Sequence, residues 1–191
     1  LTSLDIKNPG LRILPPGVER YFVKGGGLSV IEISAEDKIE IINDEGKQSC
    51  EVIVFNSKGK CDLSILNLKE NGDANFSKKA ITQDKKISKL FNRKKLDINK
   101  AKSSILFNKD CLVGEKITLT SKDKCTVMIA APGEAMNVHE QNPPTDLTVF
   151  LNKSKFEESE EQFIVPEPLG DPLYEKLVKR RTAEIYEVKK G

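Results

Sequence analysis

Several residue types are scarce or absent in this sequence of 191 residues. It contains no tryptophan, two methionines and a single histidine, His139. One histidine excludes any site that needs two or more imidazoles. No apolar run approaches the roughly 20 residues that a bilayer-spanning helix requires, and Leu1–Gly10 is polar rather than signal-like. The sequence therefore predicts a cytoplasmic protein with no membrane partner.

Cysteine is also sparse, and its spacing excludes the usual cysteine-based sites. The four cysteines are Cys50, Cys61, Cys111 and Cys125, and no two of them form a C-x-x-C pair. A zinc site needs closely spaced ligands, and a disulfide needs an oxidising compartment that no export signal supports. We therefore expect reduced cysteines, three of them within strands, and no metal site.

The composition indicates a globular chain with nearly balanced charge. Hydrophobic residues make up 38% and charged residues 31%, with a formal net charge of +2. This balance argues against a disordered chain and against a general nucleic-acid binder. Lys78–Lys102 is locally basic, with ten Lys or Arg against two Asp. We expect a solvated surface there. It lacks a stacking platform and a phosphate loop, so nucleic acid is not an expected partner.

Most of the sequence has the short apolar runs and partial alternation that are typical of β-strands. Clusters of Asn, Asp, Gly and Pro separate these runs. The expected strands are Tyr21–Val23, Leu28–Ile33, Lys38–Ile42, Ser49–Phe55, Asp62–Leu66, Lys116–Thr120, Thr126–Ala131 and Asp146–Leu151. About eight short strands predict a mainly β fold, as a sandwich or barrel-like domain.

Two segments have helical spacing instead. Asp84–Phe91 predicts a short helix in an excursion from the β domain. Asp171–Arg181 predicts a C-terminal helix, because an Asp can cap it and a Pro follows in its first turn. We therefore expect a β domain at 1–156, an acidic, proline-containing linker at 157–170, and a helix with the first strand of a second repeat at 171–191.

The two ends indicate a fragment of a longer chain. The sequence starts at Leu1 rather than Met, and it stops directly after a strand-like run. Glu184–Gly191 is identical to Glu19–Gly26 at five of eight positions. A tandem repeat cut after its first strand would have this pattern, and the downstream domains would then be partners of this one.

The first candidate site follows the turn Asn43–Gly46. The next strand starts with Gln48, Cys50 and Glu51. The Gln48 amide is a candidate ligand-binding group for a planar polar molecule. Cys50 is a candidate nucleophile only if its pKa is lowered, and Glu51 is a second candidate catalytic residue. The alternative is a hairpin turn with a polar strand entry.

The second candidate site is the loop that follows Ala130–Gly133. Loops at strand ends are frequent places for ligand contacts. Glu134 and His139 can form an acid–base pair or half of a metal site, and Asn137 is a candidate ligand-binding residue. The alternative is that this histidine is simply solvated.

Two stretches resemble the urea-carboxylase-associated domain family. They are Asp44–Gln48 followed by Val52–Asn56, and Ala130–Gly133 followed by Asn142–Asn152. The resemblance covers roughly 20–56 and 125–152. It implies a β-rich domain, seen either in stand-alone, metal-dependent deiminases or as a tandem pair that precedes a glycine-cleavage T-protein (aminomethyltransferase) module. Gly133 occupies a place where the metal-binding members would carry cysteine, which weakens the case for a metal site.

We therefore expect a non-catalytic amino-terminal accessory domain of an aminomethyltransferase-like protein. The resemblance implies that the parent chain is a transferase that moves a one-carbon unit from a small-molecule amine to tetrahydrofolate. No cofactor is expected in this segment. One alternative is a small deiminase or hydrolase that uses Cys50, Glu51, Glu134 and His139. The other is a binding module for an acidic or phosphate-bearing partner, through Lys78–Lys102.

Overall fold

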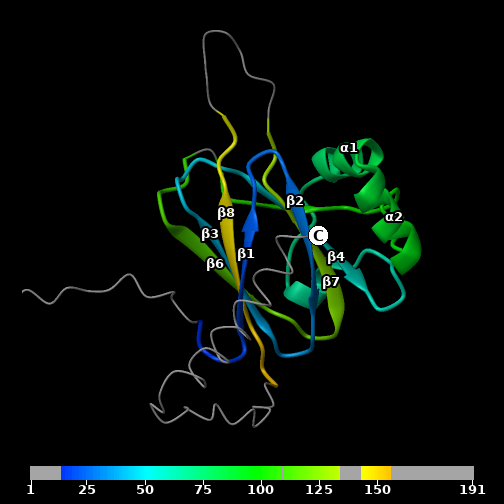
Figure 1. The fold of residues 1–191 in the computed structure, drawn as a ribbon, viewed down its shortest axis with the longest axis horizontal. Coiled ribbons are helices and arrows are strands. Elements are labelled where there is room, and N and C mark those ends of the chain that lie inside the picture. Colours follow the sequence, from blue (N-terminus) through cyan, green and yellow to red (C-terminus); the bar gives the residue numbers. More distant parts are fainter. Residues whose placement is uncertain (1–13, 109, 134–142, 156–191) are drawn as a thin grey trace, which may run out of the picture. The chain divides into compact units, whose positions relative to one another are not determined.

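The computed structural model describes residues 14–108, 110–133 and 143–155 (Figure 1). The chain divides after Phe156 into two units, Leu1–Phe156 and Glu157–Gly191. The expected linker, the C-terminal helix and the start of a second repeat all lie outside the described residues, and they stay predictions.

The described residues form two antiparallel four-stranded sheets. Sheet A has the order β1-β8-β3-β6, and sheet B has the order β2-β7-β4-β5. The strands are β1 (Val18–Val23), β2 (Leu28–Ile33), β3 (Lys38–Asn43), β4 (Cys50–Asn56), β5 (Ser104–Leu106), β6 (Glu115–Thr120), β7 (Cys125–Ala130) and β8 (Leu147–Asn152). Successive strands often alternate between the sheets, so residues far apart in the sequence become neighbours.

The inner faces of both sheets build the main core. Because side chains alternate along a strand, every second residue points between the sheets. Ile39 and Ile41 of β3, and Val52 and Val54 of β4, are fully buried there. Nearly every residue of β4 is buried, because this strand also has a covered outer face.

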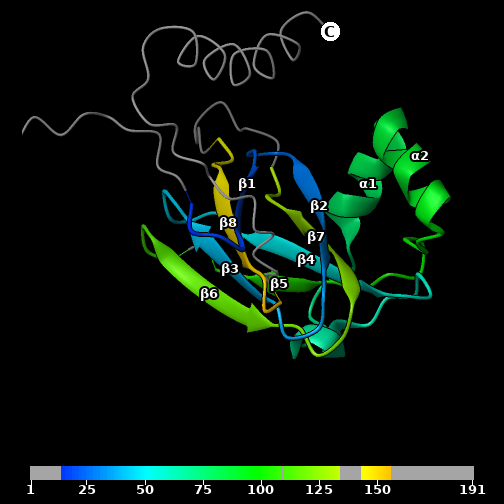
Figure 2. The same cartoon turned by 60° about the horizontal axis from the view of Figure 1, so that its bottom comes forward.

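Two helices cover that outer face of sheet B (Figure 2). They are α1 (Asn75–Gln83) and α2 (Lys85–Lys94). Phe55 of β4 and Phe91 of α2 meet edge to face, with ring centroids 5.8 Å apart, in a second buried cluster. Asp84 caps α2 by accepting hydrogen bonds from the amides of Lys86 and Ile87, a common way to satisfy the free N–H groups of a helix start.

The expected mainly β fold is confirmed, as a sandwich of eight strands in two sheets. One expected strand is wrong, because Asp62–Leu66 contains the 3-10 turn η1 (Leu63–Leu66). The Asp62 carboxylate accepts hydrogen bonds from the amide and the hydroxyl of Ser64, which holds the backbone in a turn. Within the described residues, no helix is long and apolar enough to cross a bilayer.

Candidate functional site

Six strand ends meet at one end of the sandwich, which we call the loop end. In sheet A, the register places Val23 and Asn43 beside Leu147. In sheet B, it places Leu28 and Glu51 beside Ala130. Both stretches that carry the family resemblance therefore start or finish here. The segment with Glu134, Asn137 and His139 lies outside the described residues, and these candidates stay predictions.

Gln48 connects the two chain segments at the base of the loop end. Its Nε2 donates hydrogen bonds to the carbonyl oxygens of Ser49 at 2.8 Å and Pro132 at 3.0 Å. Its Oε1 accepts a hydrogen bond from the Thr145 amide at 2.8 Å. Pro132 and Thr145 lie on either side of residues 134–142. The amide expected to bind a ligand therefore already has protein partners for both its N–H groups and its oxygen.

The backbone packs tightly around this clamp. A Cβ atom on Gly25 would lie 2.1 Å from the Pro144 carbonyl oxygen, so only glycine fits there. The Gly25 amide donates a hydrogen bond to Asp146 Oδ1 at 2.8 Å. On the other side of Gln48, the buried Asn43 donates from Nδ2 to the Gln48 carbonyl oxygen. These contacts fix β1, β3 and β8 relative to Gln48. The sequence analysis predicted none of these contacts.

Replacing Gln48 by Ala is expected to lower the free energy of unfolding by about 1–3 kcal/mol, because it removes three hydrogen bonds from a buried site. Urea denaturation followed by circular dichroism measures the change. Gln83→Ala is the matched control, since Gln83 is exposed at the end of α1. Equal effects of the two substitutions would show that Gln48 does not clamp the loop end.

Cys50 and Glu51 point to opposite faces of sheet B. Cys50 is fully buried in the core between the sheets. Burial, and then the charge of Glu51, raise the pKa of the Cys50 thiol. A neutral, enclosed thiol is a poor nucleophile. The structure therefore does not bring this thiol and this carboxylate together as a catalytic pair.

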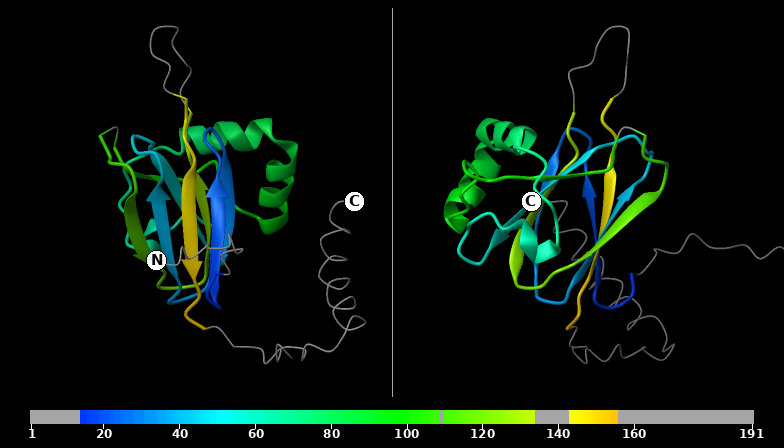
Figure 3. Two further views of the ribbon diagram at one scale, coloured as in Figure 1. Left: turned by 60° about the vertical axis from the view of Figure 1, so that its left-hand side comes forward. Right: turned by 180° about the vertical axis from the view of Figure 1, so that it is seen from behind.

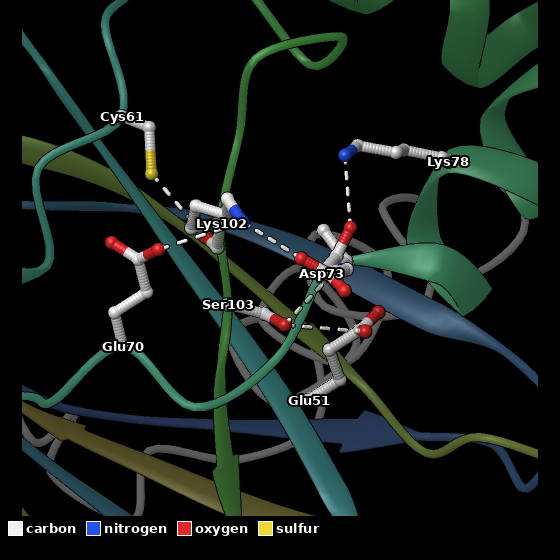
Figure 4. A network of polar contacts seen from close by, with 8 residues as sticks. Glu51, Cys61, Glu70, Asp73, Lys78, Lys102 and Ser103 are labelled. Carbon is white, nitrogen blue, oxygen red and sulfur yellow. Dashed lines mark hydrogen bonds and ion pairs between the residues drawn. The ribbon is translucent and has the colours of Figure 1, made fainter.

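Glu51 lies beneath the first turn of α1. Its Oε2 accepts hydrogen bonds from the Ser77 amide at 2.9 Å and from the Ser77 hydroxyl. Its Oε1 lies 3.4 Å from the Ser103 hydroxyl, and Ser103 Oγ also accepts a hydrogen bond from the Ala74 amide (Figure 4). Ala74 itself has no side chain that can cap α1. Glu51 thus supplies from the sheet the negative charge that a helix start favours.

A surface ion-pair group lies next to this buried network (Figure 4). Lys102 Nζ is 2.8 Å from Asp73 Oδ1 and 3.6 Å from Glu70 Oε1. The hydrogen bond between Lys102 and Asp73 lowers the pKa of Asp73 and raises that of Lys102. Both side chains are largely exposed, so this pair contributes little to stability. It does partly neutralise the basic stretch Lys78–Lys102, which forms most of α1, all of α2 and the segment after them.

An open cleft of about 530 Å³ lies beside the edges of β1 and β2. Glu19 pairs there with Lys153 and accepts a hydrogen bond from the Tyr21 hydroxyl, which raises the pKa of Tyr21 to about 12. Glu32 pairs with Lys94. Both carboxylates are therefore engaged by protein partners. In the described part of the chain, this cleft included, no three His, Cys, Asp or Glu side chains gather as a metal site would require, and all four cysteines are free.

Comparison with known proteins gives a relative that bears on the function. No family model matches the chain, so the resemblance to urea-carboxylase-associated domains stays a prediction. The chain is 32% identical over 190 residues to a trimethylamine-oxide aldolase from Ruegeria pomeroyi (strain ATCC 700808 / DSM 15171 / DSS-3). The match covers 97% of this chain but 24% of the relative. The chain therefore spans about a quarter of the length of the relative.

This similarity corrects the expected function. The prediction of a non-catalytic accessory domain of an aminomethyltransferase-like transferase is wrong, because the relative is an enzyme. The relative is named as an aldolase, and aldolases are lyases rather than transferases. The deiminase and the anion-binding module are not retained either. Almost the whole sequence of this chain is similar to part of the sequence of a trimethylamine-oxide aldolase.

Proposed function

We propose that this chain forms part of an enzyme that cleaves trimethylamine oxide or a closely related tertiary amine oxide. The observation that carries the proposal is the 32% identity that extends over 97% of the chain. A similarity of that length includes both sheets and the two helices on the outer face of sheet B, rather than one short motif. The chain then corresponds to about a quarter of the catalytic polypeptide.

The name of the related enzyme limits the products that the proposed reaction can give. An aldolase releases an aldehyde, and all three carbons of trimethylamine oxide are methyl groups on one nitrogen. The only aldehyde available is formaldehyde, and dimethylamine remains. One N–O bond, one N–C bond and one methyl C–H bond break, the oxygen becomes doubly bonded to that carbon, and the hydrogen that leaves the carbon ends on the nitrogen of dimethylamine. The methyl carbon is oxidised by two electrons and the nitrogen is reduced by two, so the reaction is redox-neutral.

The proposal is tested with the full-length gene product and trimethylamine oxide. Proton NMR is expected to show loss of the substrate methyl signal and equal amounts of dimethylamine and formaldehyde hydrate. Substrate that stays intact in the presence of folded protein would overturn the proposal. Products in unequal amounts would also contradict it, because the balanced reaction yields one of each.

The candidate residues in the loop after Gly133 are tested in the same assay. Glu134→Gln and His139→Ala, made in the full-length protein, should lower turnover if this loop contributes to the reaction. Lys89→Ala is the control, because Lys89 lies on the exposed side of α2. Turnover unchanged in both loop variants would remove Glu134 and His139 from the reaction while leaving the proposed function intact.

The sandwich itself we assign to the urea-carboxylase-associated type, again as a proposal. It is supported by the way in which the two resembling stretches converge: Gln48 of the first binds Pro132, next to Ala130 and Ala131, and Thr145 of the second.

A cytoplasmic location is also proposed, and four free cysteines fit a reducing compartment.

A further inference from the structure

The outer faces of the two sheets differ in what covers them. The outer face of sheet B packs against α1 and α2, but the described residues place no helix over the outer face of sheet A (Figure 3). Phe22 of β1 points outward there and is 53% exposed. The Arg20 guanidinium lies over its ring, and more than half of the residue surface stays exposed.

The side chains on this face have the composition of an interface. The register places Phe22, Thr148 and Ile42 in one row across the strands, and Arg20, Phe150 and Glu40 in the next. The Arg20 guanidinium lies 4.8 Å from the centre of the Phe22 ring. Glu40 pairs with Lys116 at 3.0 Å on the side of β6. Aromatic residues and arginine with a charged rim are typical of protein interfaces.

We infer that the outer face of sheet A is the surface on which the rest of the same enzyme chain docks. This inference rests on the proposed function, which takes the present chain as about a quarter of a longer polypeptide. The centre of the docking surface is Phe22, Ile42 and Phe150, and its rim is Arg20, Glu40 and Lys116.

The size of the face favours a covalently tethered occupant over a separate molecule. Four strands about 4.8 Å apart and six residues long give a face of roughly 300–400 Å². A stable complex between separate proteins usually buries about 800 Å² on each partner. A tethered segment needs less contact area, because the linker keeps its effective concentration in the millimolar range. A second copy of the chain has no such advantage.

The test measures the accessibility of this face in the full-length protein. Phe22→Cys and Thr118→Cys place thiols on the outer face of sheet A, and Lys89→Cys places one on the exposed side of α2 as the reference. Each variant is treated with a maleimide, and modification is followed by mass spectrometry of the peptide. Labelling at 22 is expected to be at least ~10-fold slower than at 89, because docked surface reacts only when it opens locally.

Two results would overturn the inference. Labelling at both 22 and 118 as fast as in the denatured protein would show that nothing covers the face. Protection that disappears on dilution would identify a second copy as the occupant. Thr118→Cys keeps the test valid if Phe22→Cys disturbs folding. If the full-length protein does not cleave the amine oxide but positions 22 and 118 are protected from labelling, the proposed function alone is overturned. If it cleaves the amine oxide and these positions are not protected, this inference alone is overturned.

Discussion

Replacing Glu51 by Ala is expected to lower the free energy of unfolding by about 2–4 kcal/mol, with the largest loss of protection in α1. Glu51 is 4% exposed, and both Ser77 and Ser103 are fully buried. Without the carboxylate, the Ser77 amide and two hydroxyl groups lose their acceptor in a place that water does not reach. The start of α1 also loses the charge that favours its dipole.

An opposing term makes this prediction informative. A buried carboxylate is costly to desolvate, so its removal recovers part of the loss. We expect the unpaired donors to dominate, because Ala74 offers α1 no alternative cap. Glu51→Gln keeps an acceptor for the Ser77 amide but not the charge, and should cost about 1 kcal/mol. Glu70→Ala is the control, because that side chain is 59% exposed.

Urea denaturation gives the change in stability, and hydrogen exchange of the Ser77 amide locates it. The expected result is faster exchange in α1, with the amides of β3 and β8 changed much less. A loss below about 0.5 kcal/mol, in the range of ordinary surface substitutions, would show that Glu51 does not cap this helix.

The residue pattern predicted the sandwich because most strands carry their own signal. β2 coincides with its expected range, and β3, β4, β7 and β8 differ by one residue at their ends. β5 has three residues and no alternation to detect, since its pairing with β4 is what makes it a strand. α1 was missed for a related reason: its cap comes from Glu51, more than 20 positions earlier in the sequence.

The candidate site shows the same limit. The type and position of Gln48 marked it as a residue of interest, but its partners Pro132 and Thr145 depend on the pairing of β7 and β8 with their neighbours. The sequence analysis named both Cys50 and Glu51 as candidate catalytic residues. The alternation of side chains along a strand directs these two to opposite faces of sheet B. Because both faces of β4 are buried, its sequence has no polar–apolar alternation that would show which face each side chain takes.

Replacing Phe55 by Ala is expected to cost about 3–5 kcal/mol, because it removes a fully buried ring and leaves a cavity between sheet B and the helices. Phe22→Ala is the matched control in the 191-residue chain. It removes the same side chain from a site that is 53% exposed, and surface substitutions usually change stability by no more than about 0.5 kcal/mol.

The two clusters of buried residues determine where the loss from Phe55→Ala should appear. Phe55 and Phe91 belong to the cluster beneath α1 and α2, while Ile39, Ile41 and Val149 belong to the core between the sheets. Hydrogen exchange should therefore accelerate in α1 and α2 more than in β3 and β8. A double-mutant cycle of Phe55→Leu and Phe91→Leu should give a coupling of about 0.5–1.5 kcal/mol for the edge-to-face pair. An equal acceleration across both sheets would instead mean that the helices and the sandwich unfold as one cooperative unit, and that the outer cluster has no independent stability.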